Sequence, residues 1–188
     1  PPDYEQGPDR TIEALAAAQG VTPEELAYDV LTAGESGGKL YLAMANYPDC
    51  SLDSVGQILS HKDVVLGLAD GGAHVGTICD ASYSTFALAH WARDRKKGRF
   101  AVEDIVHRMT GATAALAGLD DRGTIAPGKR ADLNIIDFDR LALDAPAVHY
   151  DMPAGGRRLL QRAHGYCATL VAGEVVYREG VATGALPG

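Results

Sequence analysis

Cysteine and long apolar runs are scarce in this sequence of 188 residues. The three cysteines, Cys50, Cys79 and Cys167, lie far apart and form no C-x-x-C pair. Their number and spacing exclude a disulfide framework and a zinc ribbon and are typical of a reduced protein, so we expect a cytoplasmic location. No stretch approaches the roughly 20 apolar residues of a membrane-spanning helix, and no signal peptide opens the sequence.

Basic residues are also in short supply. Lys and Arg number 17 against 25 Asp and Glu, which gives a formal net charge of -8. A nucleic acid or an anionic membrane would require a basic face, so neither is expected as a partner. The one basic run, residues 93–99, is interpreted as the last turn of a helix that Gly98 ends, because cations are stabilised there by the helix dipole.

Capping residues and apolar spacing predict six helices. Thr22 and Glu25 form a capping box with Pro23 between them, while Asp9 and Ser51 are candidate caps of two other helices. The predicted helices cover residues 11–19, 22–31, 51–59, 83–96 and 102–109 and a short alanine-rich stretch capped by Thr110. Gly20 is expected to end the first of them.

Strands are predicted in two groups. Apolar runs over residues 39–45 and 64–69 alternate with the helices and are interpreted as buried strands. Beyond Gly118 the helices give way to short strands and turns, with a strand over 131–137 and a hairpin over 169–178. A domain boundary is therefore expected between residues 118 and 124.

Asp70 is the leading candidate for chemistry. The apolar run 64–69 ends abruptly at Asp70-Gly71-Gly72-Ala73-His74, and the carboxyl ends of parallel strands face the active-site mouth in α/β enzymes. Gly71 and Gly72 would allow a close approach of the backbone to a substrate, and His74 is a candidate for substrate contact. In the alternative reading, Asp70 only caps the turn that follows it.

Five segments in order resemble the metal-dependent amidohydrolase superfamily, and most of all its branch of D-aminoacylases, the N-acyl-D-amino-acid deacylases. They are D-G-G at 70–72, T-G-A-T-A-A at 110–115, G-L at 118–119, G-T-I-A-P-G-K-R-A-D-L at 123–133 and V-A-G at 171–173. The resemblance implies an α/β fold: the C-terminal portion of a (β/α)8 TIM barrel over residues 1–118, followed by the C-terminal segment of a small β-sandwich over 119–188. A complete barrel takes about 250 residues, so the missing N-terminal part of the same chain is an expected partner.

The resemblance also implies the chemistry. A metal-dependent hydrolase of this kind cleaves a linear C–N amide bond in a small-molecule substrate, with Asp70 as the general base and acid acting on metal-bound water. A divalent metal, with zinc expected, would belong to the full-length parent, and Asp70 is its one candidate ligand here. The family takes its first ligands from a His-x-His, whereas the six histidines here include none: His61, His74, His90, His107, His149 and His164. We therefore expect these residues alone to bind no metal.

The sequence departs from D-aminoacylases after Asp70. Those proteins carry a His-Pro-Arg segment whose arginine holds the substrate carboxylate, but residues 74–82 here read H-V-G-T-I-C-D-A-S, and Arg93 is the next arginine. Free N-acyl-D-amino acids are thus disfavoured, and Asp80 and Ser82 are candidates for selecting a neutral or cationic substrate. Cys79 is interpreted as a small packed residue, because no histidine partner for an active-site thiol is evident.

Two alternatives stay open at this point. One is a cyclic amide hydrolase of the dihydroorotase or hydantoinase type, which shares the G-x-I-x-P-G-x-x-A-D-L segment. The other is a truncated, non-catalytic fragment that folds or self-associates, because open strand edges and an uncovered apolar face favour a homo-oligomer.

Overall fold

The computed structural model describes residues 2–34, 37–67 and 69–187. Its contacts divide the chain into two compact units, one over Asp3–Val64 and one that begins at Val65. This division differs from the boundary expected at residues 118–124, which separates the part of the barrel from the part of the β-sandwich and stays a prediction. None of the helices in the described part of the chain has the length and apolar character needed to cross a membrane.

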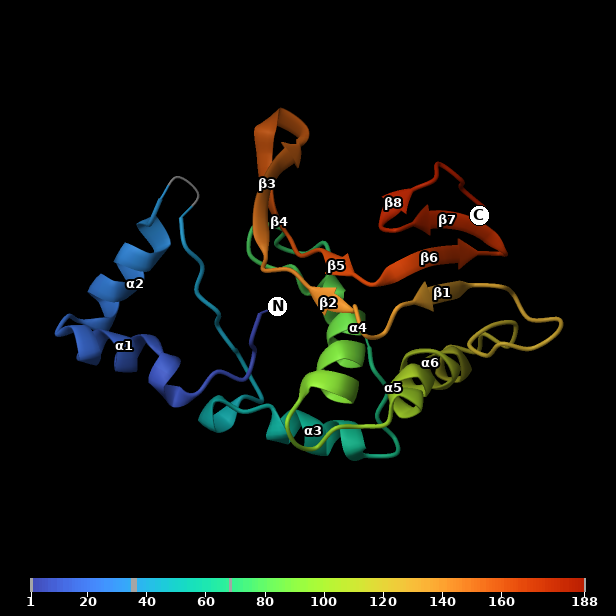
Figure 1. Ribbon diagram of the computed structural model, residues 1–188, viewed down its shortest axis with the longest axis horizontal. Helices are drawn as coiled ribbons and strands as arrows, with labels where there is room; N and C mark the ends of the chain where they lie inside the picture. The colour runs from blue at the N-terminus through green and yellow to red at the C-terminus, as the bar shows by residue number, and fades with distance from the viewer. Residues whose placement is uncertain (1, 35–36, 68, 188) are drawn as a thin grey trace. The chain divides into compact units, whose positions relative to one another are not determined.

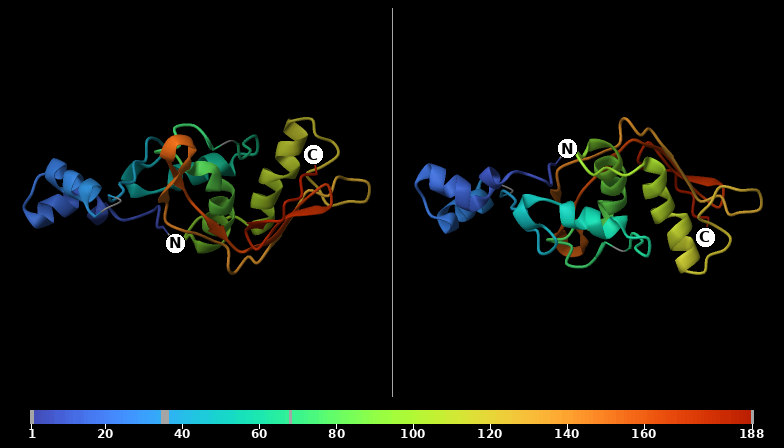
Figure 2. Two further views of the ribbon diagram at one scale, coloured as in Figure 1. Left: turned by 90° about the horizontal axis from the view of Figure 1, so that it is seen from above. Right: turned by 90° about the horizontal axis from the view of Figure 1, so that it is seen from below.

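The first unit is helical. Its elements are η1 (Pro8–Arg10), α1 (Ile12–Gln19), α2 (Pro23–Thr32), η2 (Pro48–Cys50) and α3 (Asp53–Ser60). Helices α1 and α2 pack side by side (Figure 1; Figure 2).

The helix ends in this unit follow their capping residues. Thr22 and Glu25 make the predicted capping box, and Gly20 ends α1 in the left-handed region at φ 71°. The cap of α1 is Thr11 and not Asp9, because the Thr11 hydroxyl accepts a hydrogen bond from Ala14 N at 3.2 Å. Ser51 lies just before α3, and its hydroxyl accepts from Asp53 N at 3.1 Å.

The strand predicted over residues 39–45 is not formed. These residues have no strand assignment, and their apolar side chains are exposed, with Leu42 79% and Met44 91% accessible. A strand requires hydrogen bonds to a neighbouring strand, and no described residue pairs with this segment. The prediction of a buried strand is therefore wrong in both respects, since the segment is neither a strand nor buried in the described structure.

The strand predicted over residues 64–69 is wrong for the same reason. Residues 64–67 and 69 are not in a strand, and Leu68 lies outside the described residues. The sheets of the described chain contain no parallel strand pair that could accept this segment.

The second unit begins with helices that supply its core. They are η3 (Asp80–Ser82), α4 (Tyr83–Phe86), η4 (Ala87–Asp94), α5 (Val102–Met109) and α6 (Gly111–Leu116). The helix predicted over 83–96 forms as α4 followed by the π-helical turns of η4, and α5 has the predicted bounds. Thr110 precedes α6, although its side chain makes no capping hydrogen bond. Trp91 and Ile105 are buried where η4 packs on α5.

The strands of this unit are all antiparallel. The main sheet has the order β1-β6-β7-β8 (Figure 1). Its strands are β1 (Leu133–Ile136), β6 (Tyr166–Val171), β7 (Glu174–Arg178) and β8 (Val181–Ala182). The predicted strand near residue 135 and the predicted hairpin are thereby confirmed.

Along the chain, four strands between β1 and β6 form two separate pairs. They are β2 (Ala142–Leu143) with β5 (Ala163–His164), and β3 (Ala147–Met152) with β4 (Gly156–Leu160). The β3–β4 hairpin occupies a stretch that is rich in prolines and glycines. Those residues build the turn η5 (Pro153–Gly155), in which Ala154 and Gly155 have φ of 58° and 71°.

Candidate active site

Asp70 lies on a tight, strained turn. Its φ is 42°, a left-handed value that is costly for a non-glycine residue. The turn is closed by Ala73 N, which donates to the Asp70 carbonyl at 3.0 Å. The carboxylate is exposed, and no hydrogen bond joins it to any residue in the described part of the chain. The structure therefore holds the backbone of Asp70 in place and leaves its carboxylate available, without the side-chain cap of the alternative reading.

Gly71 packs closely against Ala81. A Cβ at this position would lie 3.1 Å from the Cβ of Ala81, which is closer than most real contacts. Gly72 has a φ of 94°, a conformation that side chains disfavour. Both glycines thus shape the turn after Asp70, and their contact with a substrate stays a prediction.

His74 contributes its backbone to the same loop. Its φ is 44°, and its carbonyl accepts hydrogen bonds from Thr77 N at 2.8 Å and Ile78 N at 3.1 Å. The residue is exposed, so the imidazole is free to face a substrate. The role of His74 in substrate binding also stays a prediction.

Cys79 is a half-buried free thiol. Burial, with a smaller contribution from the charge of Asp80, raises the pKa of the Cys79 thiol. A raised pKa reduces the thiolate fraction, which is the reactive form. This agrees with the interpretation of Cys79 as a packing residue.

The loop that follows Asp70 is tied to residues far along the chain. Val75 O accepts from Leu159 N at 2.7 Å, the Ser82 hydroxyl donates to Gln161 Oε1, and Thr85 Oγ1 lies 2.8 Å from the Tyr166 hydroxyl. Sequence reasoning missed these contacts, since no local pattern links positions about 80 residues apart. Ser82 is accordingly engaged within the protein and is not an open substrate contact.

Arg93 cannot serve as a substrate anchor from its present position. Its guanidinium donates to the carbonyls of Phe138 and Asp139, to Leu141 O at 2.7 Å and to the Asp94 carboxylate. These contacts hold η4 against the chain before β2. Residues 74–82 contain no arginine, and the next arginine, Arg93, is engaged with these groups of the protein.

The described residues do not fit a metal ion by themselves. No group of three or more His, Cys, Asp or Glu side chains converges anywhere in residues 2–34, 37–67 and 69–187, whereas a zinc site takes three or four protein ligands. One exposed pair of such side chains, His164 in β5 and Asp144 just after β2, has its Nε2 and Oδ2 atoms 2.8 Å apart. Asp70 stands alone as a candidate ligand.

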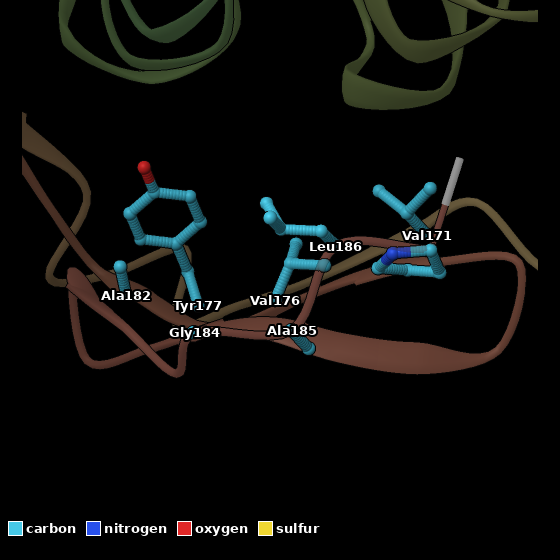
Figure 3. Close-up of a pocket in the computed structure, with 8 residues that line it drawn as sticks. Val171, Val176, Tyr177, Ala182, Gly184, Ala185 and Leu186 are labelled. Carbon is cyan, nitrogen blue, oxygen red and sulfur yellow. The ribbon is translucent and has the colours of Figure 1, made fainter.

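A shallow apolar groove lies on the main sheet, and none of the site residues predicted from the sequence lines it (Figure 3). Its volume is about 250 Å³, and its lining comes from β6, β7, β8 and the segment after them. Val171, Tyr177 and Leu186 extend to the same side. Apart from the Tyr177 hydroxyl, the lining offers no acid, base or nucleophile.

The class of protein follows from the motifs, the mixed α/β fold and the comparisons. Residues 2–177 match the family described as the amidohydrolase family. The chain belongs to this family, and it is similar to D-aminoacylases in particular. A D-aminoacylase of Alcaligenes xylosoxydans xylosoxydans is 33% identical over 177 residues, which is 93% of this chain and 32% of that protein.

Solved structures of D-aminoacylase agree with this assignment. A crystal structure described as defining a novel subset of amidohydrolases has a TM-score of 0.53 and 29% identity over 94% of this chain and 33% of its own. Another, from work on the role of the binuclear metal centre in D-aminoacylase, has a TM-score of 0.54 and 29% identity over 93% of this chain and 32% of its own. The chain thus spans about a third of the length of the relatives it matches.

Proposed function

We propose that this chain is part of a metal-dependent hydrolase that cleaves a linear C–N amide bond in a small molecule, in the manner of an N-acyl-amino-acid deacylase. The observation that carries the proposal is the exposed Asp70 carboxylate on a strained turn, in a chain that belongs to the amidohydrolase family.

In this proposal Asp70 carries out the proton transfers of amide hydrolysis. The carboxylate accepts a proton from the attacking water while the water oxygen forms its bond to the carbonyl carbon. It then delivers that proton to the leaving nitrogen as the C–N bond breaks. The products are a carboxylic acid and an amine, and Asp70 returns to its starting state.

Residues outside the described set complete the site in this proposal. The first 118 residues belong to a (β/α)8 barrel, and residues 119–188 belong to a β-sandwich. The divalent metal, with zinc expected, is held by side chains that the described residues do not supply, and Asp70 is at most one ligand. A D-aminoacylase structure solved with copper chloride supports a divalent metal in the relatives.

The substrate of the proposed reaction lacks a free carboxylate next to the amide. Residues 74–82 contain no arginine, and Arg93 is occupied by backbone carbonyls. A neutral or cationic amine portion is therefore favoured over a free N-acyl-D-amino acid. Hydrolysis of a cyclic amide is the second candidate, since residues 123–133 are shared with that class.

A substrate panel tests the proposal. The full-length protein is supplied with zinc and offered N-acetyl-D-amino acids, N-acetyl-L-amino acids, their neutral methyl amides and hydantoin, and release of amine or ring opening is followed. We expect turnover of a linear neutral amide that stops when a chelator removes the metal. Turnover of hydantoin alone would favour the cyclic class, and no turnover of any compound would reject amide hydrolysis for this panel. The 188-residue chain assayed separately is expected to be inactive.

A further inference from the structure

Three hydrogen bonds join the segment after Asp70 to β4, to Gln161 just after β4, and to the first residue of β6. Two of them, Leu159 N to Val75 O and Ser82 Oγ to Gln161 Oε1, hold the loop itself. The third, between Thr85 and Tyr166, holds the first turn of α4. All of these residues belong to the unit that begins at Val65.

Gln161 is the central member of this set. Its amide oxygen accepts from the Ser82 hydroxyl, and its amide nitrogen donates to Asp144 O at 2.9 Å. A glutamine is suited to this bridge because its amide group both accepts and donates. Gln161 thereby connects the loop after Asp70 to the chain that follows β2.

The contacts continue from Gln161 back to Asp70. Ser82 adjoins Ala81, whose Cβ would lie 3.1 Å from a Cβ at Gly71, so the backbone of Gly71 packs closely against Ala81. Gly71 directly follows Asp70. A movement of Ser82 therefore displaces the residue against which the Asp70 turn packs.

We propose that Gln161 is a positioning residue for Asp70, acting through Ser82 and Ala81. This inference rests on the proposed function, in which Asp70 transfers protons at the reacting amide. The exposed carboxylate of Asp70 has no side-chain partner in the described chain, so its direction depends on its backbone. That backbone is closed into a turn by the hydrogen bond from Ala73 N and continues into Gly71, which packs against Ala81. A misplacement of about 1 Å at a reacting group can cost about 100-fold in rate.

The test compares variants of the full-length, metal-loaded protein. Gln161→Ala and Ser82→Ala are each expected to lower kcat about tenfold while KM changes less than about twofold, because proton transfer is affected and substrate binding is not. The double variant should be no worse than Gln161→Ala, since each single variant already removes the Ser82–Gln161 hydrogen bond and Gln161→Ala also removes the bond to Asp144 O. Ser82→Thr keeps the hydroxyl and is expected to retain activity, and Gln19→Ala, on the exposed end of α1, is the matched control.

Hydrogen exchange of residues 70–82 gives a second readout without substrate. Faster exchange in Gln161→Ala than in Gln19→Ala, with the melting temperature little changed, would support the proposal that Gln161 holds the loop after Asp70. Unchanged kcat and exchange in both alanine variants would overturn it, as would kcat losses that multiply in the double variant. If the unmodified protein hydrolyses no amide, the proposed function fails, and the exchange comparison still decides whether Gln161 holds the loop.

Discussion

At the residue scale, the basic run 93–99 contains an arginine, Arg95, that packs in the core. The sequence predicts that this run forms the last turn of a helix ended by Gly98, whereas η4 ends at Asp94 and residues 95–99 lie beyond the helix. Arg95, however, is only 6% exposed, with its guanidinium 4.6 Å from the centre of the Trp91 ring and its Nη1 donating to Lys97 O at 2.9 Å. The arginine is part of the core because its planar group stacks on an aromatic ring while keeping a hydrogen bond.

Arg95→Lys is therefore expected to lower the free energy of unfolding by about 1–2 kcal/mol, because an ammonium neither stacks nor reaches the same carbonyl in the same way. Urea denaturation measures this change. Arg178→Lys, on the exposed strand β7, is the control and should change stability by no more than about 0.5 kcal/mol. Equal stabilities for the two variants would contradict the buried role of Arg95.

At the scale of elements, the success of prediction depends on where each element finds its hydrogen bonds. Helix α5 was predicted with both of its ends because a helix bonds within itself and its apolar spacing marks the buried face. The β6–β7 hairpin was predicted because a short turn brings its strands together. The predictions of strands over 39–45 and 64–69 were wrong, since a strand forms only when it pairs with another strand, and such a partner can be distant in the sequence. The Ser82–Gln161 contact was missed for the same reason.

The G-x-I-x-P-G-x-x-A-D-L segment has a structural role at this scale. Asp132 accepts hydrogen bonds from Ala172 N at 2.9 Å and from Arg130 Nε at 2.9 Å, and it pairs with Arg122 at 3.3 Å. These contacts join the start of β1 to the turn between β6 and β7. The hydrogen bond from Ala172 N, followed by that from Arg130, holds the pKa of Asp132 below its ordinary value.

This lowered pKa gives a pH-dependent contribution to stability. A carboxyl group whose pKa is lower in the folded state stabilises the protein above its unfolded pKa of about 3.9, and the contribution is lost as pH falls through the folded pKa. Asp132→Asn should lower the melting temperature at pH 7, and the difference from the unmodified protein should shrink below about pH 4. Calorimetry over this range measures it, with Asp29→Asn as control. A difference that is constant with pH would exclude a role for the charge.

At the scale of the whole molecule, the chain spans about a third of the length of the relatives it matches. It belongs to the amidohydrolase family over residues 2–177, yet its described residues include no cluster of metal ligands. Its apolar segment near Met44 is exposed in the unit over Asp3–Val64. These observations fit the proposal that the chain contributes a carboxylate and its supporting loop to a larger catalytic domain.

The most direct measurement is the hydrolysis of a linear amide by the full-length, metal-loaded protein with Asp70→Asn. The substitution keeps the size of the side chain and removes its ability to accept the proton, so kcat should fall by about 10²–10⁴ while the metal content stays the same. Asp63→Asn, at an exposed aspartate of the other unit, should retain full activity. An Asp70→Asn variant that hydrolyses the amide at the rate of the unmodified protein would contradict the assignment of Asp70 as the catalytic acid and base.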